Sequence, residues 1–150
     1  MSFDIFVKGI RGGVSSRVDR EAFLAGLGPN LTHREKYFYL ETTDGGLADV
    51  YGMEGDPFDG CMFAVHRDLT TMLADAMVSA ASAARCAIYW PSKDWLIAYP
   101  HADMLDDMPT NPEAPKPVYC ATGAELKLLI QSGLDAWKRY RDQVVRPTQE

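Results

Sequence analysis

The part of the chain with the most unusual chemistry is the segment of residues 44–59, which reads DGGLADVYGMEGDPFD. It holds five acidic residues and four glycines in sixteen positions, and apolar segments flank it. Carboxylates are the hard oxygen ligands that Ca²⁺ and Mg²⁺ require. The candidate ligands are Asp49, Glu54, Asp56 and Asp59. Their spacing does not match an EF-hand loop, and Asp beside Gly is common in turns. We therefore expect an acidic loop without a bound metal or other cofactor.

No residue pattern typical of a catalytic centre occurs in the chain. The G-x-S-x-G, G-x-G-x-x-G, Walker and zinc-deaminase signatures are all missing from the sequence. Cys61 and His66 lie at an odd offset on one expected strand, so their side chains should point to opposite faces. A pairing of Cys120 with His101 stays open. Together with Cys86, the cysteines are odd in number and have apolar neighbours, which indicates buried free thiols. We expect no catalytic residue.

A second notable segment is residues 89–95, which reads YWPSKDW. Trp90 and Trp95 flank a proline turn, and tryptophan is a residue type that anchors protein interfaces. The alternative is that both rings fill the core opposite Trp137. The sequence leaves these two interpretations open.

The charge balance limits the partners that the chain can bind. Its formal net charge is −6 and its pI is near 5.0, which argues against nucleic acid and suits a basic protein partner. Basic residues gather only near the C-terminus, at Lys138, Arg139, Arg141 and Arg146. We interpret them as the solvated face of a terminal helix, where cations complement the helix dipole.

The hydrophobic pattern predicts one α+β domain over residues 1–150, without internal repeats or linkers. Period-two alternation predicts strands at residues 3–10, 36–42, 47–51, 61–66, 86–90 and 95–99, with a brief return to the sheet at 118–120. Helices are expected at residues 20–27, from a cap at Asp68 to about residue 85, and after the Thr122 capping box. These elements indicate a largely antiparallel sheet of about five to six strands, with three helices mainly on one face.

The ends of the chain and its apolar segments indicate a cytoplasmic protein. The N-terminus lacks the basic start and the apolar run of a signal peptide. The longest helix-like apolar stretch, residues 72–84, is too short to span a bilayer. We therefore expect no membrane association.

Short motifs give the chain a resemblance to a group of small bacterial proteins. The start reads Met1-Ser2-Phe3-Asp4, residues 44–52 fit the form D-G-x-x-A-D-x-Y-G, and Met62-Phe63 follow on the next expected strand. These proteins are similar to immunity proteins of bacterial toxin systems, which are acidic, non-enzymatic α+β domains that bind and block a toxin. The resemblance covers about the first ninety residues. It implies a protein-binding role and assigns no catalytic residue.

The leading hypothesis is a non-catalytic domain that occludes a basic partner protein as an immunity-type inhibitor does. The residues expected to bind the partner are Asp49, Glu54, Asp56, Asp59, Trp90 and Trp95. One alternative is a small enzyme or ligand-binding domain that uses the acidic loop with His66 or His101. Another is a homo-oligomeric structural protein.

Overall fold

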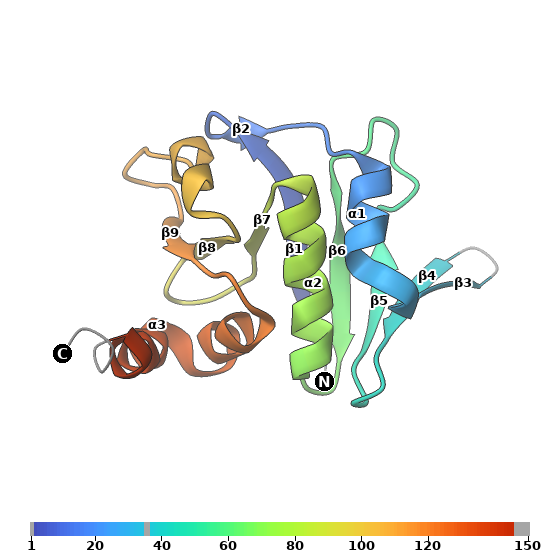
Figure 1. Ribbon diagram of the computed structural model, residues 1–150. Coiled ribbons are helices and arrows are strands. Elements are labelled where there is room, and N and C mark those ends of the chain that lie inside the picture. Colours follow the sequence, from blue (N-terminus) through green and yellow to red (C-terminus); the bar gives the residue numbers. More distant parts are fainter. Residues whose placement is uncertain (1, 35–36, 146–150) are drawn as a thin grey trace.

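The computed structural model describes residues 2–34 and 37–145 and shows a twisted mixed sheet with helices packed against it (Figure 1). The strands are β1 (Ser2–Arg11), β2 (Val14–Ser15), β3 (Leu31–Arg34), β4 (Tyr37–Glu41), β5 (Leu47–Tyr51), β6 (Gly60–His66), β7 (Cys86–Tyr89), β8 (Leu96–Tyr99) and β9 (Lys116–Tyr119). The α-helices are α1 (Arg20–Leu27), α2 (Thr71–Ala84) and α3 (Gly123–Val145). Two 3₁₀ helices, η1 (Gly28–Asn30) and η2 (Ala102–Asp107), complete the described elements.

The strands follow the order β3-β4-β5-β6-β1-β7-β8-β9, and β2 pairs with the end of β1. The long strand β1 lies between β6 and β7 and runs antiparallel to both. Helix α2 connects β6 to β7 and thereby carries the chain across β1. Every pairing among the described strands is antiparallel except that of β8 with β9, which is parallel.

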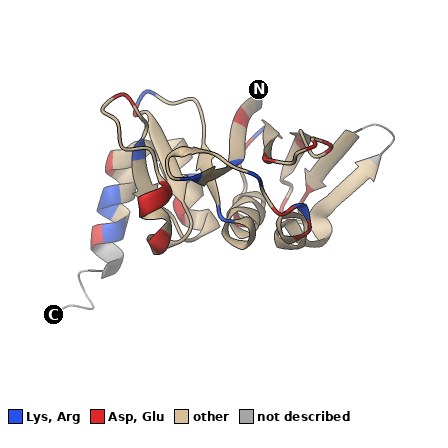
Figure 2. Ribbon diagram, turned by 90° about the horizontal axis from the view of Figure 1, so that it is seen from above, with Lys and Arg blue, Asp and Glu red and all other residues tan. Residues whose placement is uncertain are grey.

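One face of the sheet carries the core, and we call it the covered face. Period-two alternation sends Ile5 and Val7 of β1, and Phe63 and Val65 of β6, to this face, where each is fully buried. Helices α1, α2 and α3 contribute the other half of the core. Seen from above, α1 and α2 lie next to each other along this side (Figure 2). Burial of this apolar surface is the main stabilisation of the fold.

The opposite face is covered only at its β7–β9 end. There Met104 of η2 and the following Met108 pack on Ala87, Ile97 and Tyr99. Over β4, β5, β6 and β1, none of the described helices packs on this face, and we call this part the open face. The side chains on it include Asp4, Phe6, Lys8, Tyr37, Tyr39, Glu41, Leu47, Asp49, Tyr51, Met62, Ala64 and His66.

The predicted α+β class is confirmed, but the predicted size of the sheet is wrong. Within the described residues the sheet has nine strands rather than five to six, because β2 and β3 were not expected and β9 is a full member. The helix count also differs, since α3 breaks at Gly133 (φ 83°, ψ 177°) into two helical segments, which gives four. Lys36, where the second strand was expected to begin, and Arg146 lie outside the described residues.

Two of the three expected helix starts are correct. Asp19 caps α1 by accepting hydrogen bonds from Glu21 N and Ala22 N, and Thr122 caps α3 by accepting from Glu125 N at 3.2 Å. The cap expected at Asp68 is wrong. Helix α2 begins two residues later because Thr70 Oγ1 accepts from Leu73 N at 3.2 Å. None of the described helices is long and apolar enough to cross a membrane.

The turn between β4 and β5 is bonded to the start of α2 through Asp44. Its Oδ1 accepts from Thr42 Oγ1 at 2.6 Å, and its Oδ2 accepts from Met72 N at 3.0 Å. Burial acts to raise the pKa of Asp44, but these and weaker hydrogen bonds from Thr70 and Gly46 outweigh it and lower the pKa to about 2. The first acidic residue of the unusual segment therefore has a structural role.

Candidate functional site

In the structure, the acidic segment of residues 44–59 divides into the β4–β5 turn, strand β5 and the loop of residues 52–59 between β5 and β6. We use the name acidic loop for residues 52–59. This loop is held in place by its apolar residues. Phe58 is buried and packs edge-on against Phe23 of α1, with ring centroids 5.5 Å apart. Met53 is buried as well. The Phe58 carbonyl accepts a hydrogen bond from Val18 N at 2.9 Å. The loop thus has a fixed position, and its charged side chains remain on the surface.

The carboxylates of the acidic loop differ in whether a nearby cation pairs with their charge. Asp59 lies 3.5 Å from Lys8 Nζ across the start of β6. Arg20 donates to the Gly55 carbonyl and lies over the Phe58 ring at 4.9 Å, so it binds the loop backbone. Among the described residues, Glu54 and Asp56 form no ion pair. These two exposed charges are therefore free to act on a partner.

Asp49 lies on the open face and pairs with a histidine of the next strand. Its Oδ2 is 2.8 Å from His66 Nε2, and about a third of the Asp49 side chain is exposed. Asp49 is opposite Ala64 in the β5–β6 pair, and Asp4 is opposite Ala64 in the β1–β6 pair. Two carboxylates therefore flank one small residue at the middle of the open face. His66 was one of two histidines that the alternative hypothesis combined with the acidic segment of residues 44–59, and its partner Asp49 belongs to that segment.

The open face carries exposed aromatic rings beside these carboxylates. Tyr37 is 46% exposed and Tyr51 is 52% exposed, although both belong to regular strands. Phe6 of β1 stacks on Tyr89 of β7 with centroids 5.1 Å apart. Tyr51 is the last residue of β5, so it stands where the open face meets the acidic loop. The alternation in residues 36–42 and 47–51 predicted strands whose successive side chains point to opposite faces. It did not show which of the two faces is exposed to solvent.

The structure separates the two tryptophans that were expected to bind a partner. Trp90 is 4% exposed and belongs to the main core, so the core interpretation holds for it and its ring is not available on the surface. Trp95 is 53% exposed, and its indole N–H donates to the Glu113 carbonyl at 3.1 Å. The β7–β8 connection that carries Trp95 lies at the opposite side of the molecule from the acidic loop (Figure 1). The two regions therefore do not form one site.

The cysteines are placed as structural groups. Burial raises the pKa of the Cys61 thiol strongly and the pKa values of Cys86 and Cys120 to about 12. Protonated, buried thiols are poor nucleophiles. Cys61 lies on the covered face and His66 on the open face, as their offset predicted. His101 Nε2 lies 2.9 Å from Ser82 Oγ, so its partner is in α2.

A hollow of about 340 Å³ lies beside the acidic loop, between β1, β2, β7 and β8. Lys8, Ser15, Asp59 and Tyr89 supply its polar groups. Burial, together with the negative charge of Asp59, raises the pKa of Tyr89. Neither His66 nor His101 lines it. Within the described residues, no group of three or more His, Cys, Asp or Glu side chains is arranged to hold a metal ion.

Comparison of the chain with protein-family models, with curated proteins and with solved structures finds no match.

Proposed function

We propose that the chain is a protein-binding domain that covers a basic surface of a partner protein, as an immunity-type inhibitor does. The contact surface is the acidic loop together with the adjoining open face. The observation that carries this proposal is the open face itself, where exposed tyrosines and carboxylates occupy regular strands that no helix covers. Large exposed rings at an uncovered surface are typical of interfaces.

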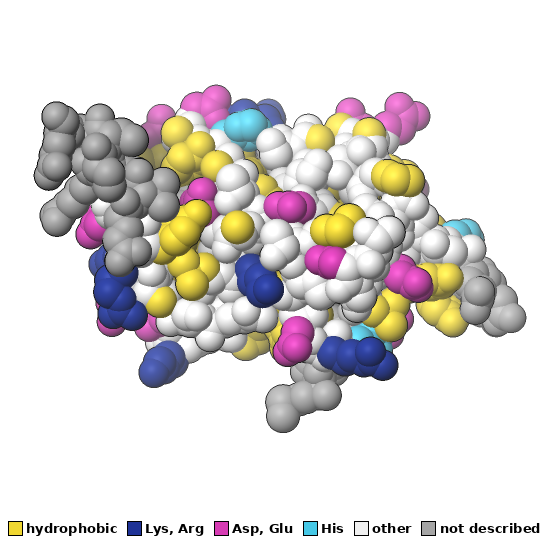
Figure 3. Space-filling view, turned by 60° about the horizontal axis from the view of Figure 1, so that its bottom comes forward, with side chains coloured by type: hydrophobic (Ala, Val, Ile, Leu, Met, Phe, Trp, Pro, Cys, Tyr) yellow, Lys and Arg dark blue, Asp and Glu magenta, His cyan; other side chains and the backbone are white. Residues whose placement is uncertain are grey.

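The size of the surface fits this role. The four strands of the open face, at a spacing of about 4.8 Å and with about six residues each at 3.3 Å per residue, give a flat area on the order of 400 Å². A standard interface takes about 800 Å² from each partner. The open face alone therefore supplies about half of that area, and the acidic loop extends it. By contrast, the view from below shows hydrophobic side chains only in small groups between polar and charged ones (Figure 3).

Electrostatics would set the rate at which the partner associates. Glu54 and Asp56 are exposed and form no ion pair among the described residues, and the chain has a net charge of −6. Such charges attract a basic partner over distances of about a Debye length, roughly 8 Å at physiological salt. Tyr51 would then pack against the partner once the two surfaces meet.

To test this proposal, the tagged full chain is used to capture binding proteins from a lysate of the host cell. Mass spectrometry then identifies them. We expect a basic protein in near-equal amount. Its association rate at low salt should fall about tenfold when Glu54→Lys and Asp56→Lys are combined. The matched control combines Asp106→Lys with Glu113→Lys, which make the same charge change elsewhere and should change the rate much less. A recovered partner that is acidic, or equal losses in both variants, would contradict the proposal.

Small-molecule binding in the hollow beside Asp59 is a second candidate function. The hollow has a volume within the usual range for ligand sites, roughly 300–1,000 Å³, and joins Lys8, Asp59 and Tyr89 over an apolar floor. Thermal denaturation in the presence of a metabolite library tests it. A ligand that raises the Tm of the parent chain, but not that of Tyr89→Phe or Lys8→Met, would favour this function over protein binding.

A further inference from the structure

The break in α3 creates a groove at the far edge of the sheet. Gly133 leaves the helical conformation at φ 83°, a region that favours glycine. Asp94 Oδ2 then accepts from Leu134 N at 3.4 Å and caps the second helical segment. This segment lines a groove of about 480 Å³ together with β9. The groove is on the opposite side of the sheet order from the β3–β4 end, and none of the acidic-loop residues lines it.

The wall of the groove formed by the sheet is a strand edge that pairs with none of the described strands. Strand β9 is the last strand in the order. On its other side, Lys116 N donates to the Trp95 carbonyl at 2.8 Å and Cys120 N to the Tyr99 carbonyl at 3.0 Å. Alternate residues of a parallel strand direct their backbone groups to opposite sides. Pro117 and Tyr119 therefore offer two carbonyls and one N–H to the outside. A free edge of this kind is a template for an added strand.

The groove joins an apolar lining to a local excess of positive charge. The exposed apolar part of its lining comes from Leu134 and the half-exposed Tyr119, while Val118 and Trp137 lie buried beneath it. The Arg141 guanidinium lies 4.9 Å over the Trp137 ring and 3.8 Å from Asp142 Oδ1. The cations that line it are Lys116, Lys138 and Arg141. The one carboxylate in the lining, Glu125, is already engaged by the Thr122 hydroxyl at 3.3 Å. Figure 2 shows both blue and red segments along this end of α3, where the sequence places Lys138, Arg139 and Arg141 between Asp135 and Asp142.

We infer that this groove binds an extended acidic peptide segment of a partner protein. The segment would add to the edge of β9 through the backbone groups of Pro117 and Tyr119. Alternate apolar side chains would pack on Leu134 and Tyr119, while intervening carboxylates would reach Lys138 and Arg141. A peptide fits better than a nucleic acid strand, because only a peptide supplies backbone donors and acceptors at strand spacing.

The inference is independent of the proposed function, because the ligand carries the opposite charge and binds at the opposite end of the sheet. The basic residues near the C-terminus were interpreted from the sequence as a solvated helix face. In the structure, two of them, Lys138 and Arg141, are also placed to contact a ligand. They form the rim of an apolar groove.

The test selects binders to the full chain from a phage-displayed library of random dodecapeptides. We expect sequences that alternate acidic and apolar residues. A synthetic peptide of the enriched sequence is then titrated by fluorescence anisotropy. Combining Lys138→Glu with Arg141→Glu should weaken its binding at least tenfold. In a ¹⁵N NMR titration, the amide of Tyr119 should shift on binding.

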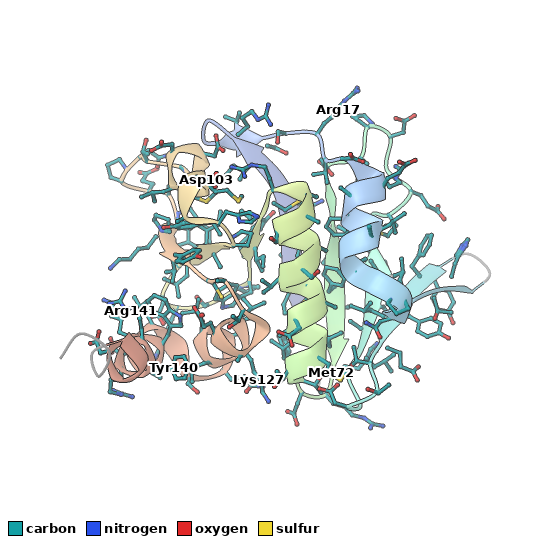
Figure 4. All side chains as sticks on the ribbon, viewed as in Figure 1. Arg17, Met72, Asp103, Lys127, Tyr140 and Arg141 are labelled. Carbon is teal, nitrogen blue, oxygen red and sulfur yellow. The ribbon has the colours of Figure 1, made fainter. Side chains whose placement is uncertain are left out.

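The matched control combines Arg11→Glu with Arg17→Glu, which changes the net charge equally. Arg17 and Arg141 lie at opposite ends of the molecule (Figure 4). This control should change the affinity by less than twofold, and thermal melts should show that both variants fold. No enriched peptides, peptides without acidic residues, or equal losses in the two variants would overturn the inference. Displacement of the peptide by the single-stranded oligonucleotide (dT)12 at comparable concentration would reassign the groove to nucleic acid.

Discussion

The two faces of the same strands differ sharply, although they alternate residue by residue. On β5 and β6 the covered face holds Ala48, Val50 and Phe63, which are at most 3% exposed. The residues between them on the open face include Asp49, which is one-third exposed, and Tyr51, which is half exposed. The covered face therefore supplies stability, and the open face is available for recognition. Substitutions on the two faces should separate these properties.

The largest expected effect is on the covered face. Phe63→Ala removes a fully buried ring and should lower the free energy of unfolding by about 3–5 kcal/mol. Met62→Ala changes the adjacent residue of β6, which points to the open face, and should cost less than about 1 kcal/mol. Urea denaturation measures both. Similar losses in the two variants would show that the open face is covered in the folded protein in solution.

The second-largest effect on stability is expected at the contact between α1 and α2, which pack on the covered face. At Gly26 of α1, an added Cβ would lie 2.6 Å from Ala80 Cα and 2.7 Å from the Ser79 carbonyl oxygen in α2. Helix propensity alone predicts that Gly26→Ala stabilises by about 1 kcal/mol. Backbone overlap predicts a loss of about 1–3 kcal/mol instead. The sign of the change in Tm therefore decides between the two. A stabilised variant would mean that α1 and α2 are farther apart than described.

Features that depend on residues adjacent in the sequence were predicted well, and features that depend on contacts between distant residues were not. Helix α1 matches its predicted bounds, and the β4–β5 hairpin has its turn at the predicted Asp-Gly-Gly. The parallel pairing of β8 with β9 joins residues about twenty positions apart, and no local pattern specifies it. The break at Gly133 was not visible either, because the apolar spacing continues across it from Leu129 to Leu134 and Trp137.

The candidate site was predicted only in part for the same reason. The charged residues of the acidic loop follow from composition, since Glu54 and Asp56 beside glycine are turn residues. The pairing of Asp49 with His66 depends on the register of β5 against β6. The burial of Trp90 depends on the main core, which joins residues far apart in the sequence. Both are properties of the assembled sheet, so the open face could not be assigned from one strand at a time.

A smaller effect on stability is expected at the β4–β5 turn, which is bonded to the start of α2. Asp44→Asn removes the charge that accepts from Met72 N at the start of α2 and should cost about 1 kcal/mol at pH 7. The pKa of Asp44 is lowered in the folded state to about 2 from an ordinary value of 3.8. Its contribution is therefore complete above about pH 4 and is lost as the pH falls toward 2.

Urea denaturation of both proteins at pH 7, 4 and 3 tests this dependence. The difference between the parent chain and Asp44→Asn should be constant from pH 7 to about pH 4–5 and should shrink at pH 3. Asp106→Asn, an exposed carboxylate of η2, is the control and should show no such change. A difference that does not depend on pH would mean that the loss comes from side-chain geometry rather than from the charge.

The smallest expected effect lies on the open face itself. Asp49 and His66 form a close pair, but both side chains are partly exposed, so water screens their interaction. A double-mutant cycle with Asp49→Asn and His66→Gln should give a coupling free energy of about 0.2–1 kcal/mol. The pair therefore adds little to stability. If the open face binds a basic partner, the same Asp49→Asn change should slow association with that partner while leaving the Tm within a few degrees. A coupling above about 2 kcal/mol would instead assign the pair to the stability of the sheet and remove Asp49 from the recognition surface.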